Sequence, residues 1–192
     1  VFGATLCPAS VGGTVWRNLS GEFKERLYAV NPKHADLNGV PASPNVASLP
    51  EAPDLAVICT PPATVARLIA ELGARGTRAA IVITARLSTK QKQAMLDASR
   101  VHMLRILGPN CIGMLSPHVG LNASFLYISA QPGELAFVSQ SGALVTAMLD
   151  WAGSRGIGFS HFVSLGEHAD IDFGDLLDFL GSDAKTHAIL LY

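Results

Sequence analysis

Glycine and hydroxyl residues near the start of the sequence could form an anion-binding turn. Gly3-Ala4-Thr5 follow an apolar pair, and Ser10-Val11-Gly12-Gly13 come at the expected start of a helix. Free N–H groups and the positive end of a helix dipole attract phosphate, and glycine lets it approach the backbone. The spacing is not Gly-x-Gly-x-x-Gly, so the fingerprint of NAD-binding proteins does not fit. The segment is either a phosphate-binding loop or an ordinary glycine-rich turn of an α/β fold.

The residues at the end of the second expected strand help to distinguish NAD from other candidate nucleotide ligands. In dinucleotide dehydrogenases this strand ends with Asp or Glu, whose carboxylate binds the ribose hydroxyls. Here Val30 is followed by Asn31-Pro32, and the next residue is Lys33. A cation suits a ligand that carries a phosphate on its ribose, such as coenzyme A or NADP. Taken alone, Lys33 could equally be a solvated loop lysine.

Three further expected strands end in residues that could line one ligand site. These ends are Cys59-Thr60-Pro61-Pro62, Ile83-Thr84-Ala85 and Gly108-Pro109-Asn110-Cys111. Ligands of open parallel sheets bind at the carboxyl ends of the strands. Each segment alone is weak evidence, because turns use Gly, Pro and Asn anyway. Together they indicate an edge whose backbone could bond a pantetheine arm.

The elements that position these residues alternate between strands and helices. Short apolar runs predict strands at 1–3, 27–30, 55–59, 79–84 and 104–107. The spacing of Val65, Leu68, Ile69 and Leu72 predicts a helix that ends near Gly76. A second helix is expected over about 89–98. Strand–helix–strand units at this spacing predict right-handed crossovers, and hence a Rossmann-like, doubly wound parallel sheet of the α/β class.

A second unit is expected after Gln131-Pro132-Gly133. Its predicted strands are 135–138, 159–165 and 188–192, and its predicted helices are 141–151 and 173–180. The helix at 141–151 is apolar almost all round, which predicts that it is well buried. We place the boundary near Ala130, which gives domains 1–130 and 131–192. The second unit has too few expected strands to complete a sheet, which predicts a truncated domain.

Composition excludes several classes of protein. The chain has 192 residues, 49% of them hydrophobic, and a formal net charge of −1. This balance gives no electrostatic footprint for nucleic acid or an anionic membrane, and no apolar run is long enough to span a bilayer. Three widely spaced cysteines predict neither a disulfide framework nor a zinc site. A cytoplasmic location is the simplest interpretation.

Longer motifs carry a family resemblance. They are Gly108-Pro109-Asn110-Cys111-Ile112-Gly113, Leu121-Asn122-Ala123, the run from Phe137 to Leu144, Ser164-Leu165-Gly166 and Ala169-Asp170-Ile171-Asp172-Phe173. Over essentially its whole length the sequence resembles the CoA-binding half of NDP-forming acyl-CoA synthetases, which is related to the α subunit of succinyl-CoA synthetase. It is also similar to the synthetase-like region of bacterial protein lysine acetyltransferases.

The resemblance implies a CoA-binding, Rossmann-like domain followed by the start of a flavodoxin-like ligase domain. It carries CoA (or acetyl-CoA) contacts onto Gly3, Thr5, Val11, Gly12, Lys33, Thr60, Pro61, Thr84, Asn110 and Cys111. It also implies that the helix start at Ser139, Ser141 and Gly142 helps to hold a phosphohistidine. Hydroxyls and free N–H groups at a helix start suit a dianionic phosphate, although the two serines could serve only as helix caps.

Several positions depart from the family pattern. The family's phosphohistidine lies beyond Tyr192, so no catalytic residue is expected within this chain. We interpret the six histidines as surface or packing residues, with His168 a possible neighbour of the site. Arg86 stands where the family usually has glycine, and it could obstruct the thiol end of CoA or bind a phosphate. Cys111 has no neighbouring base and is interpreted as structural.

Three functions follow as hypotheses. The first is part of an ADP-forming acyl-CoA (acetyl-CoA) synthetase, in which ATP or ADP with Mg²⁺ binds only to an ATP-grasp domain or subunit outside this chain. Acyl transfer would then pass through an acyl phosphate and the phosphohistidine, and this chain alone would bind CoA without turnover. The second is a non-catalytic CoA or acetyl-CoA sensor attached to an acetyltransferase domain. The third is an NAD(P)-dependent oxidoreductase. The missing acidic residue at the second strand end argues against NAD, Lys33 leaves NADP open, and no catalytic pattern supports hydride transfer. The resemblance also implies self-association.

Overall fold

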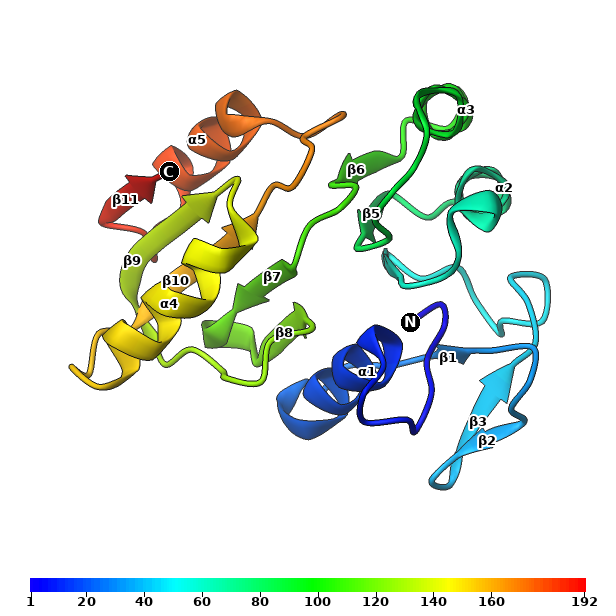
Figure 1. Cartoon of the computed structure of the whole chain (residues 1–192), viewed down its shortest axis with the longest axis horizontal. Helices are drawn as coiled ribbons and strands as arrows, with labels where there is room; N and C mark the ends of the chain where they lie inside the picture. The colour runs from blue at the N-terminus through cyan, green and yellow to red at the C-terminus, as the bar shows by residue number, and fades with distance from the viewer.

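The computed structural model describes all residues, 1–192, and arranges them around two sheets (Figure 1). The helices of the first part are α1 (Val11–Glu22), α2 (Pro62–Ala74) and α3 (Thr89–Val101), and its strands are β1 (Ala29–Val30), β2 (Asp36–Leu37), β3 (Val40–Ser43), β4 (Leu55–Ile58), β5 (Ala79–Val82) and β6 (Arg105–Leu107). The second part contains β7 (Gly113–Ser116), the 3₁₀ turn η1 (Pro117–Val119), β8 (Leu121–Ser124), β9 (Pro132–Ser139), α4 (Gly142–Gly153), β10 (Phe159–Ser164), α5 (Phe173–Ser182) and β11 (Ala188–Leu191). The predicted α/β class and Rossmann-like sheet are confirmed.

The first sheet is parallel and is joined at its centre by Phe2. Phe2 forms parallel bridges to Val30 of β1 and to Ile58 of β4. The strands β4, β5 and β6 continue the sheet in that order, and β3 lies parallel on the outer side of β1. Only β2 runs against its neighbour β3. All the parallel strands therefore end at one edge.

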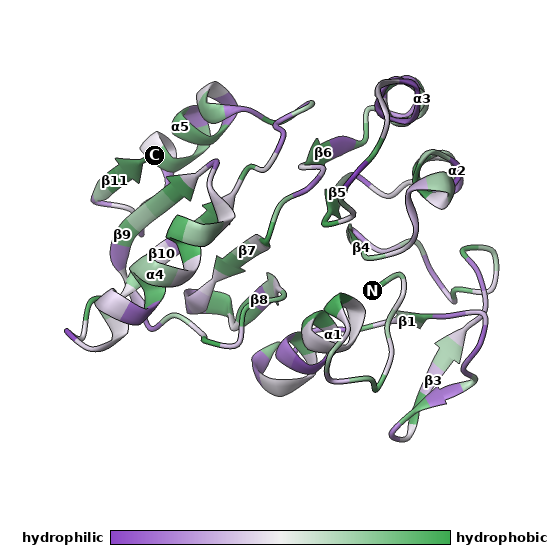
Figure 2. Ribbon diagram, in the orientation of Figure 1, coloured by the Kyte–Doolittle hydropathy of each residue, from purple (hydrophilic) through white to green (hydrophobic).

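Both faces of this sheet are buried. Alternate residues of β4 and β5, such as Ile58 and Val82, pack with α2 and α3 on one face. Val57 and Ile81 point to the other face, into a core that includes Val15 of α1. That core continues into the second sheet, and the two halves of the chain thus share one hydrophobic interior. Figure 2 shows the same pattern, with hydrophobic strands inside and hydrophilic residues on α3.

The second sheet has five strands in the order β11-β9-β10-β7-β8. Strands β9, β10 and β11 are parallel, whereas β7 and β8 form an antiparallel extension. The sequence did not predict β7 or β8, which lie before residue 131 and add two strands to the three expected for the second unit. The truncation of that unit stays a prediction. The domain boundary near residue 130 stays a prediction, although the strand pairing already joins 113–124 to the second sheet.

The sequence predicted that the helix at 141–151 is well buried, and this prediction was wrong. Helix α4 covers the sheet with Val145, Leu149 and Ala152, which pack on phenylalanines of β9 and β10. Its Trp151 is 48% exposed and has Arg155 stacked on its ring. Helix α4 is apolar almost all round, but only the side that faces the sheet is buried. None of the helices is long and apolar enough to cross a membrane.

We expect His161 in β10 to make folding sensitive to acid. Its Nδ1 is buried and lacks a hydrogen-bond partner, and burial lowers the pKa of His161, although nearby Asp183 opposes this effect and His118 adds to it. The unfolded state therefore takes up the proton first, and stability is lost as pH falls below the ordinary histidine pKa.

Each kcal/mol of stability lost corresponds to a fall of about 2–4 °C in Tm for a chain of this size. Melting at pH 7.5 and pH 5.5 should show a smaller drop for His161→Phe than for wild type. Equal drops would contradict the prediction.

Candidate functional site

A cavity of about 760 Å³ lies where the parallel strands end. We call it the strand-end cavity. Its lining comes from the segments after β4, β5, β6, β8, β9 and β10 and from the first residues of α1 and α4. The lining residues are Val11, Cys59, Thr60, Pro61, Ile83, Thr84, Ala85, Asn110, Cys111, Ile112, Phe125, Gln140, Gly142, Ala143, Gly166 and Glu167. The predicted ligand edge thus coincides with a cavity between the two sheets.

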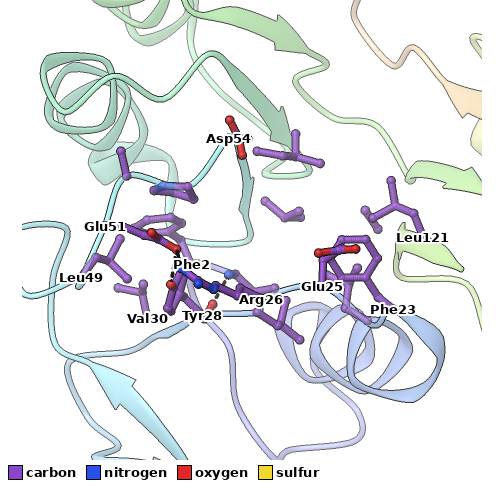
Figure 3. Close-up of a pocket in the computed structure, with 18 residues that line it drawn as sticks. Phe2, Phe23, Glu25, Arg26, Tyr28, Val30, Leu49, Glu51, Asp54 and Leu121 are labelled. Carbon is purple, nitrogen blue, oxygen red and sulfur yellow. Dashed lines mark hydrogen bonds and ion pairs between the residues drawn. The ribbon is translucent and has the colours of Figure 1, made fainter. Parts of the chain in front are cut away.

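A different cavity, of about 600 Å³, lies at the opposite ends of the strands (Figure 3). Three of its polar residues, Arg26, Tyr28 and Glu51, bond to one another. Glu51 accepts a hydrogen bond from Tyr28 Oη at 2.6 Å and another from Arg26 Nη1 at 2.8 Å, and these bonds lower the pKa of Glu51. Ligands of parallel α/β sheets bind at the carboxyl ends of strands. This cavity is therefore not the candidate site.

The first turn is built for close backbone contact with α1. Gly3 has φ +86°, and a Cβ at Gly12 would lie only 2.0 Å from the Gly3 carbonyl oxygen. The Ser10 hydroxyl accepts the Gly13 N–H at 3.0 Å and caps the helix. The remaining free N–H groups of the first helical turn leave a site that favours an anion.

Asn31 connects this turn to the segment that carries Lys33. The Asn31 side chain donates to the carbonyl of Ala4 at 2.7 Å, and its oxygen accepts the Lys33 N–H at 2.8 Å. The Lys33 side chain is exposed and does not line the strand-end cavity. It follows the end of β1, however, and thus stands at the same edge of the sheet.

Polar residues at the ends of β4 and β5 hold one another in place. Thr84 Oγ1 donates to the carbonyl of Thr60 at 2.8 Å, and Thr64 Oγ1 donates to Thr60 Oγ1 at 2.7 Å. The N–H of Asn110 donates to the carbonyl of Thr84 at 3.1 Å. Arg86 adopts φ +62°, a conformation that favours glycine. The backbone at Arg86 would therefore suit the glycine that the resemblance implies at this position, although the residue here is a cation.

Glu167 is a site residue that sequence reasoning missed. Its carboxylate accepts Lys92 Nζ at 2.8 Å and Asn110 Nδ2 at 3.3 Å, and the Glu167–Lys92 pair is about one-third exposed. The available signal was an acidic residue directly after the quoted Ser164-Leu165-Gly166 motif. This carboxylate fixes the amide of Asn110, which itself has φ +57°. His168 follows Glu167 but does not line the cavity.

The structure brings only part of the predicted set together. Seven of the predicted residues line the strand-end cavity, namely Val11, Thr60, Pro61, Thr84, Asn110, Cys111 and Gly142. The others do not line it, namely Gly3, Thr5, Gly12, Lys33, Ser139 and Ser141. The ligand roles of both groups stay predictions, and those of Gly3, Thr5, Gly12 and Lys33 concern the part of the same edge that lies outside the cavity.

The two serines before α4 use their hydroxyls internally. Ser139 Oγ is buried and exchanges hydrogen bonds with the backbone N–H and carbonyl of Ser141, both at 3.0 Å. Ser141 Oγ caps the helix by accepting from Leu144 N at 3.5 Å. A phosphate at this helix start would therefore rely on backbone N–H groups near Gly142 more than on the hydroxyls.

The cysteines near the cavity are poor nucleophiles. Burial raises the pKa of Cys59 and of Cys111 to about 12 in each case, and Cys111 Sγ points to the carbonyl of Val82 at 3.5 Å. A neutral thiol reacts slowly. We expect iodoacetamide at pH 8 to label exposed Cys7 alone in the native chain, and all three cysteines in denaturant. Intact-mass analysis with peptide mapping reads this out, and rapid native labelling of Cys111 would contradict it.

Two family models match the chain. The CoA binding domain family matches residues 1–117, and the succinyl-CoA ligase-like flavodoxin domain family matches residues 132–192. The chain is 36% identical, over its whole length, to acetate–CoA ligase (ADP-forming) I of Archaeoglobus fulgidus, of which it covers 29%. It is 34% identical to the α subunit of acetate–CoA ligase (ADP-forming) II of Pyrococcus furiosus and covers 43% of it. The chain therefore spans less than half the length of these relatives.

Solved structures agree with the sequence relatives. A structure of Ca. Korarchaeum cryptofilum dinucleotide-forming acetyl-coenzyme A synthetase 1 in complex with phosphate and ADP matches the whole chain with a TM-score of 0.95 and 36% identity, and the match covers 42% of that chain. An ATP citrate lyase from Methanothrix soehngenii, in complex with citrate and coenzyme A, matches 85% of this chain and 30% of its own, with a TM-score of 0.64 and 15% identity. The second likeness concerns the fold alone. None of these four proteins is an acetyltransferase.

Proposed function

We propose that this chain, which belongs to the CoA-binding domain family and continues into a succinyl-CoA ligase-like domain, binds coenzyme A along the carboxyl edge of its parallel sheet. The observation that carries the proposal is the strand-end cavity, with its lining of Thr60, Pro61, Thr84 and Asn110. The cavity opens at the edge where the glycine turn and Lys33 also stand. The residues fit a phosphate-bearing, extended ligand at this edge.

Each part of the edge has a distinct role in this proposal. The turn at Gly3 and the start of α1 take the diphosphate, because no Cβ separates a ligand from their N–H groups. Lys33 pairs with the ribose 3′-phosphate. The backbone groups at Thr60 and Thr84 bond the pantetheine arm, whose thiol then reaches Asn110. The amide of Asn110, held by Glu167, orients the thiol end.

The acyl-transfer chemistry belongs to the longer protein in this proposal. Its ADP-forming relatives support a synthetase that joins a carboxylic acid to CoA. The family resemblance implies that acyl transfer then passes through an acyl phosphate and a phosphohistidine. An ATP-grasp unit outside this chain would bind ATP with Mg²⁺, and the start of α4 would receive the phosphate. Self-association and the cytoplasmic location indicated by the cysteine spacing stay predictions.

A CoA sensor for an acetyltransferase is the second candidate function. It would use the same cavity and differ only in the domains attached to it. The ligase relatives favour the synthetase, because the family resemblance extends across the whole chain. The phosphohistidine motif downstream of this chain distinguishes the two. A histidine in that motif favours the synthetase, and its absence beside an acetyltransferase domain favours the sensor.

Replacement of Lys33 by methionine tests the binding mode. We expect Lys33→Met to weaken CoA binding roughly tenfold, because a charge-assisted phosphate contact at an exposed position contributes at most a few kcal/mol. The variant should leave the affinity for 3′-dephospho-CoA unchanged. Calorimetric titration with CoA, 3′-dephospho-CoA and NADP measures this.

The matched control is Lys24→Met, which removes an exposed lysine between α1 and β1, at the other end of the sheet. It should leave all three affinities unchanged. Equal losses for CoA and 3′-dephospho-CoA in Lys33→Met would remove Lys33 from the site. Tight binding of NADP without binding of CoA would favour the oxidoreductase hypothesis instead.

A further inference from the structure

The carboxylate of Glu167 uses its two oxygens for two different partners beside the strand-end cavity. Oε2 accepts Lys92 Nζ of α3 at 2.8 Å, and Oε1 accepts Asn110 Nδ2 at 3.3 Å. Glu167 and Asn110 both line the cavity, whereas Lys92 does not. The three side chains therefore form a short series of polar contacts that runs from helix α3 to the cavity wall.

The backbone of Asn110 is fixed on both sides of its Cα. Its N–H donates to the Thr84 carbonyl at 3.1 Å, and its own carbonyl oxygen lies against Gly166, where a Cβ would approach that oxygen to 2.5 Å. Its φ of +57° is left-handed, a conformation that asparagine tolerates better than most residues. The direction of the side-chain amide is therefore the main freedom that remains at this residue.

The backbone also holds Glu167 against this loop. Glu167 N donates to the Pro109 carbonyl at 2.9 Å, and Ala169 N donates to the Gly108 carbonyl at 3.0 Å. The pair that Glu167 forms with Lys92 is only about one-third exposed, so that the ammonium group takes the place of part of the water around the carboxylate. The carboxylate is thus kept in one place with its charge balanced.

The chemistry of the carboxylate decides which way the Asn110 amide points. An ionised carboxylate only accepts hydrogen bonds. The amide must therefore turn its NH2 group to Glu167, and its oxygen then faces away from that carboxylate. No group of the chain donates to Asn110 Oδ1, and Asn110 is exposed at the cavity. A ligand that reaches this oxygen binds it as a hydrogen-bond donor.

We propose that Glu167, with Lys92 on its second oxygen, is a positioning residue that holds the Asn110 amide oxygen toward the ligand, where it accepts a hydrogen bond from the thiol end of CoA. The inference rests on the proposed function, which brings that end of CoA to Asn110. Two donors occur there, namely the S–H group and the neighbouring amide N–H. Glu167 itself does not touch the ligand and acts through Asn110.

Glu167→Gln tests the orienting role. Glutamine has nearly the same size and still bonds Asn110, but it offers either an NH2 group or an oxygen, so that the Asn110 amide is no longer held in one orientation. We expect the affinity for CoA to fall roughly fivefold, the effect of one hydrogen bond. The affinity for adenosine 3′,5′-bisphosphate, which lacks the pantetheine arm, should not change. Calorimetric titration of the whole chain measures both.

A thiol-free analogue distinguishes the two donors. In dethio-CoA a hydrogen atom replaces the thiol group, and the amide N–H remains. If Glu167→Gln weakens the binding of CoA but not that of dethio-CoA, the donor to Asn110 is the S–H group. If it weakens both equally, the donor is the amide N–H. Lys92→Met should weaken CoA binding by less than Glu167→Gln, because the carboxylate keeps its bond to Asn110.

Two matched controls accompany these variants. Glu71→Gln removes a partly exposed carboxylate that pairs with Arg67 on α2, and Lys90→Met removes an exposed lysine of α3. Both should leave all affinities unchanged. An unchanged affinity for CoA in Glu167→Gln, or equal losses for CoA and adenosine 3′,5′-bisphosphate, would overturn the positioning role. If the wild-type chain does not bind CoA, the proposed function itself fails and this inference fails with it.

Discussion

Replacement of Gly12 by alanine is expected to weaken CoA binding by about a hundredfold and to lower the Tm. The new Cβ would lie 2.0 Å from the Gly3 carbonyl oxygen and 2.9 Å from its carbon, both of which are backbone atoms. Helix α1 must therefore move away from the turn, at a cost of about 1–3 kcal/mol for overpacking. The same movement separates the free N–H groups of α1 from the Gly3 turn, so that both parts of the proposed phosphate site are lost together.

Gly21→Ala is the matched control for Gly12→Ala. Gly21 lies in the last turn of the same helix, and a Cβ there would meet no heavy atom within 4 Å. Alanine at this position should leave CoA affinity unchanged and raise stability by up to about 1 kcal/mol, because alanine is the better helix former. Calorimetry gives the affinities and scanning calorimetry the Tm values. Normal CoA binding by Gly12→Ala would show that the ligand does not use this turn.

The first sheet was predictable because its signals are local. The apolar run that became β4 is buried on both faces, and the i, i+3, i+4, i+7 pattern at Val65–Leu72 coincides with the buried stripe of α2. The position of the candidate site at the strand ends followed from the rule that ligands bind at the carboxyl edge of a parallel sheet. The strands, the helix and the parallel sheet can therefore be inferred from neighbouring residues together with the right-handed crossover rule.

The second sheet was less predictable because its strands pair over long distances. β7 is four residues long and pairs with β10, which begins more than forty residues later. Nothing in the short run Gly113–Ser116 indicates that partner. The hairpin to β8 turns at Gly120, which has φ +66°, and the glycine itself was a usable local signal for a turn.

Glu167 shows why part of the site escaped the sequence. A single acidic residue in a loop is ordinary, and its importance comes from Lys92 and Asn110, which are 75 and 57 residues away. Motifs identified the loop but not the direction of its side chains. The cavity-lining role of Phe125 was hidden for the same reason, since it depends on the course of the chain after β8.

Removal of the Asp170 carboxylate is expected to lower the free energy of unfolding by about 2–3 kcal/mol. Asp170 Oδ2 accepts the backbone N–H of Ile106 at 2.6 Å, and the same carboxylate pairs with Arg105 Nε at 3.1 Å. Ile106 is fully buried, so Asp170→Ala leaves its N–H without an acceptor in the interior. The loop after β10 keeps its backbone hydrogen bonds to the segment 106–109, such as Ile171 N to Ile106 O at 3.1 Å, and therefore stays attached to β6.

Three variants separate the buried hydrogen bond from the ion pair. Asp178→Ala, on the exposed side of α5, is the control and should leave stability unchanged. Asp170→Asn keeps an acceptor for the Ile106 N–H but loses the charge, and it should recover most of the stability. The Arg105 pairs are half exposed and hence weak. Urea unfolding gives the free energies, and hydrogen exchange at Ile106 reports the bond directly. If Asp170→Asn is as unstable as Asp170→Ala, the contribution of Asp170 to stability comes from its charge rather than from the buried N–H, and high salt should then destabilise the wild-type chain to the same extent.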